Sequence, residues 1–367
     1  MVREASLLLL FGLFGPLVGC KPNLNETVSL ISGTRVLAVQ AEPAEVSPMA
    51  MTPVSFSLLV VDDNGVVAHP DAEWTFCETR NPLANLGPVA PSCVQPWSPP
   101  STPSTVSDSD AGPAPPPYVG FGGGEAATAT IPTNACSLFG PNPPPPLMNQ
   151  PPGRPVDPDP TGGYYQPVTA FVVAQGTTIP TLFPYRISCG FANVDPTSSG
   201  ELTSRYHLNV NPAVESLAIV GGATLQPDST GMTNTVAAGQ ELQLEVAWPS
   251  CPLVDKCGDT FCGADESLMS CPLDCKTPKG CPGAERFVNF SLSSESVVDQ
   301  REGINVAWYA TGGTFANDTT GNAGTDTTLT SDNGWTAPEA SGPVHMWVVL
   351  ADARGGIGWA GYALNVQ

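Results

Sequence analysis

Nineteen residues in the second half of the chain, CGDTFCGADESLMSCPLDC at 257–275, combine four cysteines with four acidic side chains. Cysteine thiolates at close spacing bind zinc, and carboxylates on a short stiff loop bind calcium. In an oxidising compartment the same cysteines pair as disulfides instead. The segment is therefore a candidate for a metal site, a catalytic centre or a cross-linked structural insert.

The zinc and catalytic interpretations each lack one requirement. Zinc needs reduced thiolates in two close pairs, and the spacings Cys257-x₄-Cys262 and Cys271-x₃-Cys275 only approach this pattern. A catalytic cysteine needs a nearby base, and none of the three histidines lies in the segment. They stand at positions 69, 207 and 345, and His207 and His345 are expected to point outward from strands.

A disulfide-stapled insertion at 251–281 is the interpretation that we favour. Such a short run has no core of its own, so cross-links must supply its order. A bridge between Cys251 and Cys281 would clamp its ends, and the sandwich would need only that those ends be joined. The candidate calcium ligands within it are Asp259, Asp265, Glu266 and Asp274. Their spacing is not that of an EF-hand, and solvated carboxylates are the alternative; no other cofactor is expected.

The N-terminus indicates the compartment. Arg3 is followed by an apolar stretch from Leu7 to Val18, too short to span a bilayer and typical of an export signal. The residues Leu17-Val18-Gly19-Cys20 resemble the lipobox of bacterial lipoproteins, which implies cleavage after a signal peptide of about twenty residues and acylation of Cys20. Several acyl chains hold a protein on a membrane firmly. An ordinary cleaved signal is the alternative.

Lys21 directly follows the expected lipid cysteine and resembles the residue found in lipoproteins sent to the outer membrane or cell surface. Residues 21–33 are expected to form a tether. The chain has 13 Lys plus Arg against 34 Asp plus Glu, a formal net charge of −21. This balance argues against binding nucleic acid or anionic lipid by charge.

The positioning elements are predicted to be strands. Short runs alternate with period two between Gly, Pro and Asp-Gly signals, as in PVSFSLLVVDDNGVV and ELQLEVAW, and no stretch of comparable length has helical periodicity. The motifs RYHLNV at 205–210 and GYALNV at 361–366 each suggest the closing strand of a unit. We predict an all-β protein of two β-sandwich domains, 34–211 and 212–367.

Each predicted domain carries an interruption and an even number of cysteines. A Pro/Ser/Gly-rich insertion of about 81–163 in the first domain is expected to stay extended, because its composition buries too little apolar surface. The second domain carries the insertion 251–281. Apart from Cys20, the disulfide candidates are Cys77, Cys93, Cys136 and Cys189, then Cys251, Cys257, Cys262, Cys271, Cys275 and Cys281. The sequence does not choose their connectivity.

The cysteine segment resembles a short repeat of the form Cys-Gly-Asp/Asn-Gly-x-Cys…Glu…Cys-Pro-x-Asp-Cys in surface proteins of myxobacteria and related delta-proteobacteria. Thr260 stands where the repeat usually has glycine, which weakens the case for a tight turn. The C-terminal stretches AWYATGGTF and GPVHMWVVLADARGG resemble the ends of Ig-like domains in predicted lipoproteins of the same bacteria. This resemblance covers the lipobox and most of the second domain, and the first domain only loosely; it implies an Ig-like architecture and a compartment, and no chemistry.

Function is therefore expected to be structural or binding, without catalysis, at the outer membrane or cell surface. Trp347 falls on the strand face opposite Val344, Met346 and Val348, so it is a candidate ring for stacking on a sugar. The alternatives are a carbohydrate- or calcium-dependent adhesin, or an accessory subunit of an envelope complex. Expected partners are the membrane, through lipid, and an envelope protein or polysaccharide, with no nucleic acid.

Overall fold

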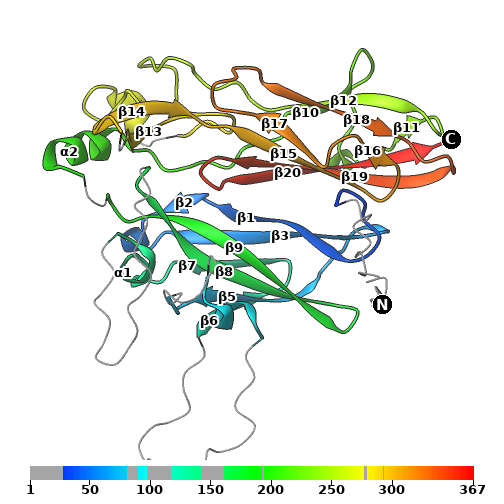
Figure 1. Ribbon diagram of the computed structural model, residues 1–367, viewed down its shortest axis with the longest axis horizontal. Coiled ribbons are helices and arrows are strands. Elements are labelled where there is room, and N and C mark those ends of the chain that lie inside the picture. Colours follow the sequence, from blue (N-terminus) through cyan, green and yellow to red (C-terminus); the bar gives the residue numbers. More distant parts are fainter. Residues whose placement is uncertain are drawn as a thin grey trace, which may run out of the picture.

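The computed structural model describes residues 28–80, 89–96, 117–141, 161–191, 194–276, 279–291 and 293–367. The lipidation candidate Cys20 and residues 21–27 of the expected tether lie outside these ranges. The described chain forms two β-sandwiches that lie side by side, with most strands running along the long axis (Figure 1). The predicted all-β, two-sandwich fold is confirmed. In the described part, no helix is both long and apolar enough to traverse a bilayer.

The first sandwich is built on long alternating strands. Val54, Phe56, Leu58 and Val60 enter its core with at most 4% exposure, and the strand then turns at Asp63-Asn64. One sheet contains β1 (Arg35–Glu42), β3 (Pro53–Asp62), β4 (Gly65–Val66) and β7 (Ala126–Thr130). The other has the order β2 (Glu45–Val46), β9 (Thr177–Ser188), β8 (Gly163–Ala174), β5 (Asp71–Cys77), β6 (Tyr118–Gly123).

The second sandwich packs around Trp248, Trp308 and Trp335, all at most 1% exposed. Its smaller sheet has the order β10 (Ser216–Ile219), β12 (Glu241–Ala247), β18 (Thr330–Thr336), β16 (Thr314–Phe315). Its larger sheet has the order β11 (Asn234–Val236), β20 (Ile357–Val366), β19 (Gly342–Asp352), β15 (Ile304–Ala310), β17 (Thr319–Asn322). A separate hairpin of β13 (Arg286–Ser291) and β14 (Ser296–Arg301) follows the cysteine-rich segment.

Part of the Pro-rich insertion belongs to the first sandwich, so the expectation that about 81–163 stays extended without ordered structure is wrong for residues 117–141. Strand β6 pairs with β5, and β7 pairs with β3. The disulfides Cys77–Cys93 and Cys136–Cys189 fasten the described pieces of the insertion to the sandwich. Cross-links and edge pairing thus order a stretch whose composition gives it no core.

Helices are short and few in the described chain. They are α1 (Ala135–Phe139), α2 (Pro196–Arg205) and α3 (Pro272–Cys275), with 3₁₀ turns η1 (Pro48–Ala50), η2 (Pro91–Val94) and η3 (Asp228–Thr230). Helix α2 begins at Asp195, whose carboxylate accepts the N–H groups of Thr197 and Ser198 at 2.9 and 3.1 Å, and Pro196 takes the first helical position. This Asp-Pro start is a helix signal that periodicity alone does not reveal.

A buried apolar interface joins the two sandwiches. Leu59 and Val61 point from β3 away from the first core, and Trp347 and Val349 point from β19 toward them. All four are at most 6% exposed. The expectation of an exposed ring at Trp347 is therefore wrong: a face that looks outward within one sandwich is covered by its neighbour.

Residues 28–31, within the expected tether, lie on the second sandwich. Leu30 forms a parallel bridge with Ala310 at the end of β15, and the N–H of Ile31 donates to the Ala310 carbonyl at 2.9 Å. Ile31 is 1% exposed within the interface cluster. The chain is thus fastened to the second sandwich before it enters β1 of the first.

Candidate functional site

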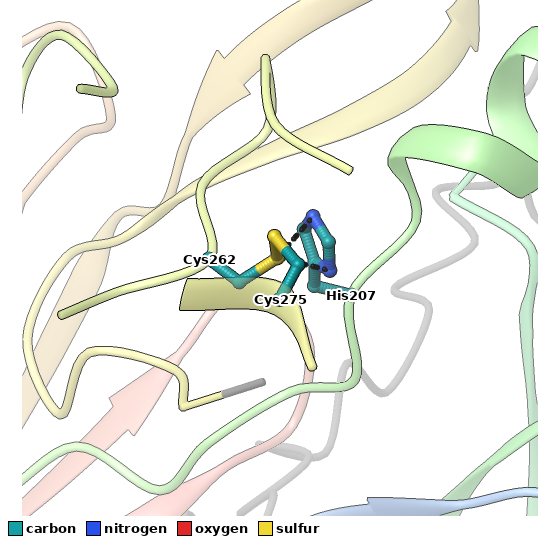
Figure 2. Close-up of side chains that lie close together, drawn as sticks. All are labelled: His207, Cys262 and Cys275. Carbon is teal, nitrogen blue, oxygen red and sulfur yellow. Dashed lines mark hydrogen bonds between the residues drawn. A yellow bond between two sulfur atoms is a disulfide. The ribbon is translucent and has the colours of Figure 1, made fainter. Parts of the chain in front are cut away.

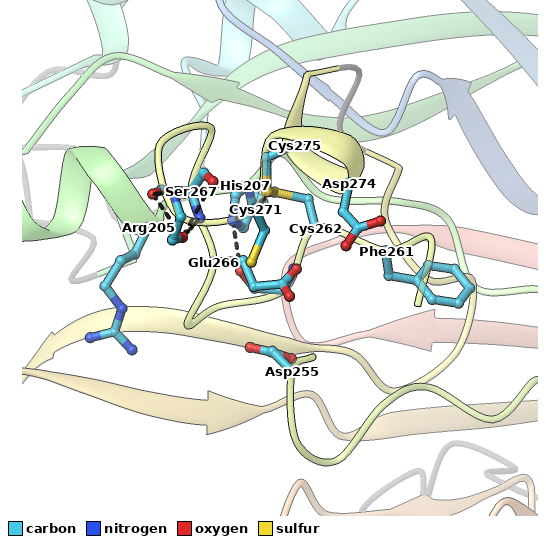
Figure 3. The surroundings of a disulfide bond; sticks show 12 residues. Arg205, His207, Asp255, Phe261, Cys262, Glu266, Ser267, Cys271, Asp274 and Cys275 are labelled. Carbon is cyan, nitrogen blue, oxygen red and sulfur yellow. Dashed lines mark hydrogen bonds between the residues drawn. A yellow bond between two sulfur atoms is a disulfide. The ribbon is translucent and has the colours of Figure 1, made fainter. Parts of the chain in front are cut away.

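Three disulfides shape the cysteine-rich segment, which we define as residues 251–281. Cys251 pairs with Cys281 and joins the two ends of the segment. Inside it, Cys257 pairs with Cys271 and Cys262 with Cys275, so the two inner bridges interleave along the chain. Helix α3 begins directly after Cys271. Figure 3 shows the acidic side chains around the Cys262–Cys275 bridge.

Three of the four predicted calcium ligands converge. Oxygen atoms of Asp259, Glu266 and Asp274 lie within 4.8 Å of one another, and we call these three residues the carboxylate cluster. Glu266 and Asp274 are 3% and 6% exposed, and Asp259 is half-buried. The two inner disulfides cross-link the turns on which the three carboxylates of the cluster stand.

Backbone N–H groups orient each carboxylate of the cluster. Asp274 accepts from Gly258 at 2.5 Å and from Thr260 at 3.2 Å. The Oε2 atom of Glu266 accepts from the Gly263 N–H at 3.1 Å, whereas its Oε1 atom is buried without a hydrogen-bond partner among the described residues. Burial raises the pKa of Glu266 above its ordinary range; the Gly263 bond opposes the rise and the charges of Asp259 and Asp274 add to it.

Thr260 adopts a backbone conformation that glycine, the usual residue of the similar repeat at this position, would adopt easily. Its φ is +78°, in the left-handed region that costs a β-branched residue about 1–2 kcal/mol. The substitution of threonine for the usual glycine therefore does not remove the tight turn. Its N–H points to Asp274, so the strained turn helps to place one carboxylate of the cluster.

Asp265, the fourth predicted ligand, lies apart from the cluster. Its carboxylate pairs with Arg205 of α2 at 2.9 Å and with Arg286 of β13 at 3.2 Å. Asp299 of β14 pairs with the same two arginines. The segment is thereby tied to the helix and the hairpin through exposed and half-exposed ion pairs, each of which contributes little stability alone.

His207 contacts the segment, contrary to its predicted place on an outward strand face. Residues 206–215 form no strand, and the ring of His207 lies beside the Cys262–Cys275 disulfide (Figure 2). Its Nε2 atom is 2.8 Å from the Gly263 carbonyl, and Cys262 Sγ is 3.5–3.6 Å from the two ring nitrogens. Burial lowers the pKa of His207. Because both sulfurs are bonded to each other, they supply no thiolate to zinc or to catalysis.

His69 and His345 are far from this arrangement. His69 is exposed with a φ of +53°. His345 is half-buried on β19, and its ring stacks on that of Trp347 with 6.1 Å between centroids. Neither joins a group of potential metal ligands within the described residues.

The segment is an insertion, yet it is packed into its surroundings. Ala264 is fully buried in a small core with Leu202 of α2 and with Val288 and Phe290 of the hairpin. Without the segment, α2 and the β13–β14 hairpin would each lose their covering. No described residue of 251–281 belongs to the core of either sandwich, so the expectation that the sandwich needs only its two ends joined stays a prediction. The α2 helix, the segment and the hairpin form one unit at the end of the molecule (Figure 1).

A buried polar cluster lies next to this unit, centred on Arg354 in the β19–β20 turn. The guanidinium donates to Glu302 at 2.7 Å, to Glu285, and to the backbone carbonyl of His207 at 3.0 Å. Burial lowers the pKa of Arg354, but Glu302 and Glu285 overcome this and raise it. Burial raises the pKa of Glu302 and of Glu285, against the opposing effect of Arg354.

The link between the sandwiches, residues 206–211, is held from both sides. The Asn209 N–H donates to Glu45 of the first sandwich, and its side-chain amide donates to Asp352 of the second at 3.2 Å. Glu45 also accepts from Arg186 at 3.0 Å. Asn211 donates to the Ala41 carbonyl at 2.7 Å. RYHLNV thus belongs to a linker in which Asn209 is buried and Leu208 is exposed, and it does not close a unit, whereas GYALNV lies in β20 as predicted.

Comparison with known proteins identifies no relative. No family model matches the chain, and no curated protein matches it. Among solved structures, the D0-D1 domain of intimin aligns over 90% of this chain and 98% of its own, at 11% identity and a TM-score of 0.18. The adhesin InvE of Yersinia pseudotuberculosis aligns over 90% of this chain and 58% of its own, at 12% identity and a TM-score of 0.19. Alpha-2-macroglobulin of Escherichia coli aligns over 92% of this chain and 17% of its own, at 7% identity and a TM-score of 0.23. Such low scores transfer no role to this chain.

Proposed function

We propose that the chain is a non-catalytic protein of the cell envelope, anchored by lipid on Cys20, that presents the cysteine-rich segment to a protein partner. The export signal and lipobox support the location, and disulfides are typical of exported proteins. The two sandwiches, joined by a buried interface and by a linker whose Asn209 is hydrogen-bonded to both, provide a stiff support. A binding role, and not a catalytic one, suits a segment whose cysteines are all paired in disulfides.

The observation that carries this proposal is the apolar surface of the segment. Met269 is 95% exposed, Leu273 88%, Val254 77%, Leu268 60% and Leu253 54%. Single exposed apolar residues are ordinary on a protein surface, but here five of them gather within 31 residues that also carry three disulfides. Disulfides constrain the backbone that carries these side chains, which lowers the backbone entropy that a partner must remove on binding.

A protein suits this surface better than a polysaccharide. Aliphatic side chains bury area against other apolar groups, whereas sugar sites use exposed aromatic rings. Trp347, the ring on which the sugar-binding alternative rested, is fully buried. A groove of about 460 Å³ is lined by Asp71, Glu73, Tyr118 and Phe171, but its two rings are only 8% and 5% exposed and offer little stacking surface.

The anchor is tested with Cys20→Ala. Because the cysteine thiol is the acylated atom, we expect this variant to remain an unprocessed precursor, about twenty residues longer, without the lipid mass increment. The wild-type chain should partition with membranes and be released only by detergent. Mass spectrometry and membrane fractionation measure both properties. Release of the wild-type chain into the soluble fraction, with an unmodified Cys20, would contradict the anchor.

The presenting surface is tested with Met269→Glu and Leu273→Glu. Both side chains are exposed, so we expect each variant to unfold within about 0.5 kcal/mol of the wild type. Cross-linking in intact cells should give one discrete wild-type adduct that both variants lose. Met232→Glu, on an exposed side chain outside the segment, should keep it. If the adduct survives both changes, or Met232→Glu removes it equally, the segment is not the binding surface.

A further inference from the structure

We propose that Asp259, Glu266 and Asp274 hold one calcium ion. This inference goes beyond the proposed function and does not depend on the lipid anchor or on the protein partner. It concerns the ion that would balance the carboxylate cluster, in which three acidic side chains lie close together. Figure 3 shows Glu266 and Asp274 beside the Cys262–Cys275 disulfide.

The geometry suits a single calcium ion. Calcium binds oxygens at about 2.3–2.6 Å, so two ligands on opposite sides of one ion lie up to about 5 Å apart. One oxygen from each of the three carboxylates can be chosen so that all three lie within 4.8 Å of one another, which falls inside that limit. Because several backbone N–H groups already fix Asp274, Glu266 and Asp259, the ligands are positioned before any ion arrives.

The second observation is an unsatisfied buried atom. Glu266 is 3% exposed and its Oε1 has no hydrogen-bond partner among the described residues, and its carboxylate has an oxygen within 4.8 Å of oxygens of Asp259 and Asp274. A buried polar atom without a partner costs about 1–3 kcal/mol and calls for an explanation. Within the described chain, no ion pair brings a lysine or arginine to the cluster, since Arg205 and Arg286 pair with Asp265, Asp299 and Asp255.

The ligand chemistry selects among metals. The three side chains offer only hard oxygen atoms, which suit calcium and magnesium and not zinc. The neighbouring sulfurs of Cys262 and Cys275 are in a disulfide and are not available as thiolates. Calcium accepts an irregular set of six to eight oxygens completed by carbonyls and water, whereas magnesium requires a near-octahedral set. The three carboxylates stand on different turns held by disulfides, and such an irregular set of ligands favours calcium over magnesium.

The test uses the full chain, purified in detergent with its disulfides intact and freed of metal by chelation. We expect calcium to bind with one site and a dissociation constant of about 10⁻⁴–10⁻³ M, the range of extracellular modules. At about 10 mM calcium the melting temperature should rise by about 2 °C or more. Magnesium and zinc at the same concentration should raise it by clearly less. Isothermal calorimetry and thermal unfolding measure both effects.

The variants Glu266→Gln and Asp259→Asn remove one charge each while keeping the shape of the side chain. Each should weaken calcium binding about 10- to 100-fold, the range seen even for groups that only support a metal ligand. The matched control is Asp265→Asn, in the same segment with the same charge change, and it should retain the wild-type affinity. Near-ultraviolet circular dichroism confirms that each variant is folded.

Two results would overturn the proposal. The first is the absence of calcium binding and of any thermal shift at about 10 mM, which would mean that the cluster holds a shared proton in place of a metal. The second is an equal loss of binding in Asp265→Asn, which would reduce the effect to general charge. Lipid modification and cross-linking do not enter this test, so its failure leaves the proposed function standing. Failure of the anchoring and cross-linking tests would likewise leave the calcium proposal standing.

Discussion

Replacing Arg354 with methionine is expected to lower the free energy of unfolding by about 3–5 kcal/mol at neutral pH. Arg354 is 2% exposed and is the cation that Glu285 and Glu302 share. Its removal leaves both carboxyl groups buried without a positive partner and removes the donor to the His207 carbonyl in the linker. Chemical denaturation followed by circular dichroism measures the change.

This loss should depend on pH, and its sign follows from proton binding. Burial already raises the pKa of both glutamates, and without Arg354 it rises further. The folded variant then binds more protons than the unfolded chain, so its stability falls as pH rises above the ordinary glutamate pKa of about 4.3. The deficit relative to wild type should be larger at about pH 8 than at about pH 5.

Arg35→Met is the matched control, because Arg35 donates only to backbone carbonyls near the surface. We expect it to cost less than about 1 kcal/mol, with no such pH dependence. A deficit in Arg354→Met that equals the control, or that grows toward acid pH, would show that the buried cluster does not depend on its arginine.

Replacing Trp347 with alanine is expected to cost about 3–5 kcal/mol and to uncouple the two sandwiches. The ring is fully buried between them, in the cluster that contains Ile31, Leu59 and Val349. Each sandwich keeps its own larger core, so the variant should unfold in two transitions where the wild type unfolds in one. Denaturant titration and small-angle scattering detect the separation.

Leu273→Ala serves as the control for Trp347→Ala, since this side chain is 88% exposed. It should leave the midpoint within about 0.5 kcal/mol of the wild type and preserve a single transition. If Trp347→Ala also unfolds in one transition at the wild-type midpoint, the apolar interface does not couple the sandwiches.

Alternation along the chain predicts the long core strands, but neither β6 and β7 inside the Pro-rich insertion nor the absence of a strand at 206–210. In β3, residues 54, 56, 58 and 60 fill one core, as period two indicates. Leu59 and Val61 lie on the other face of the same strand and are buried by the second sandwich. Trp347 was misjudged for the same reason, because periodicity describes a strand relative to its own sheet and contains no information on what covers the other side.

The carboxylate cluster was partly predictable, because three of the four acidic residues chosen from one short stretch meet in space. Asp265 was wrongly grouped with them, since its partners Arg205 and Arg286 come from elements 60 and 21 residues away. His207 was missed because it lies 55 residues before Cys262 and reaches it only through the path of the linker. Local spacing predicts neighbours within a loop and does not predict what long-range packing brings to it.

The fastening of residues 28–31 has a mechanical consequence. Residues 28–31 and the cysteine-rich segment lie at opposite ends of the long axis, and β1, which follows residues 28–31, runs along that axis (Figure 1). A pull between the two ends would act along β1, whose residues from Arg35 to Glu42 pair in antiparallel register with β3. Hydrogen bonds loaded in this direction are sheared together and not opened one by one, so the fold should resist tension best along the line joining its two ends.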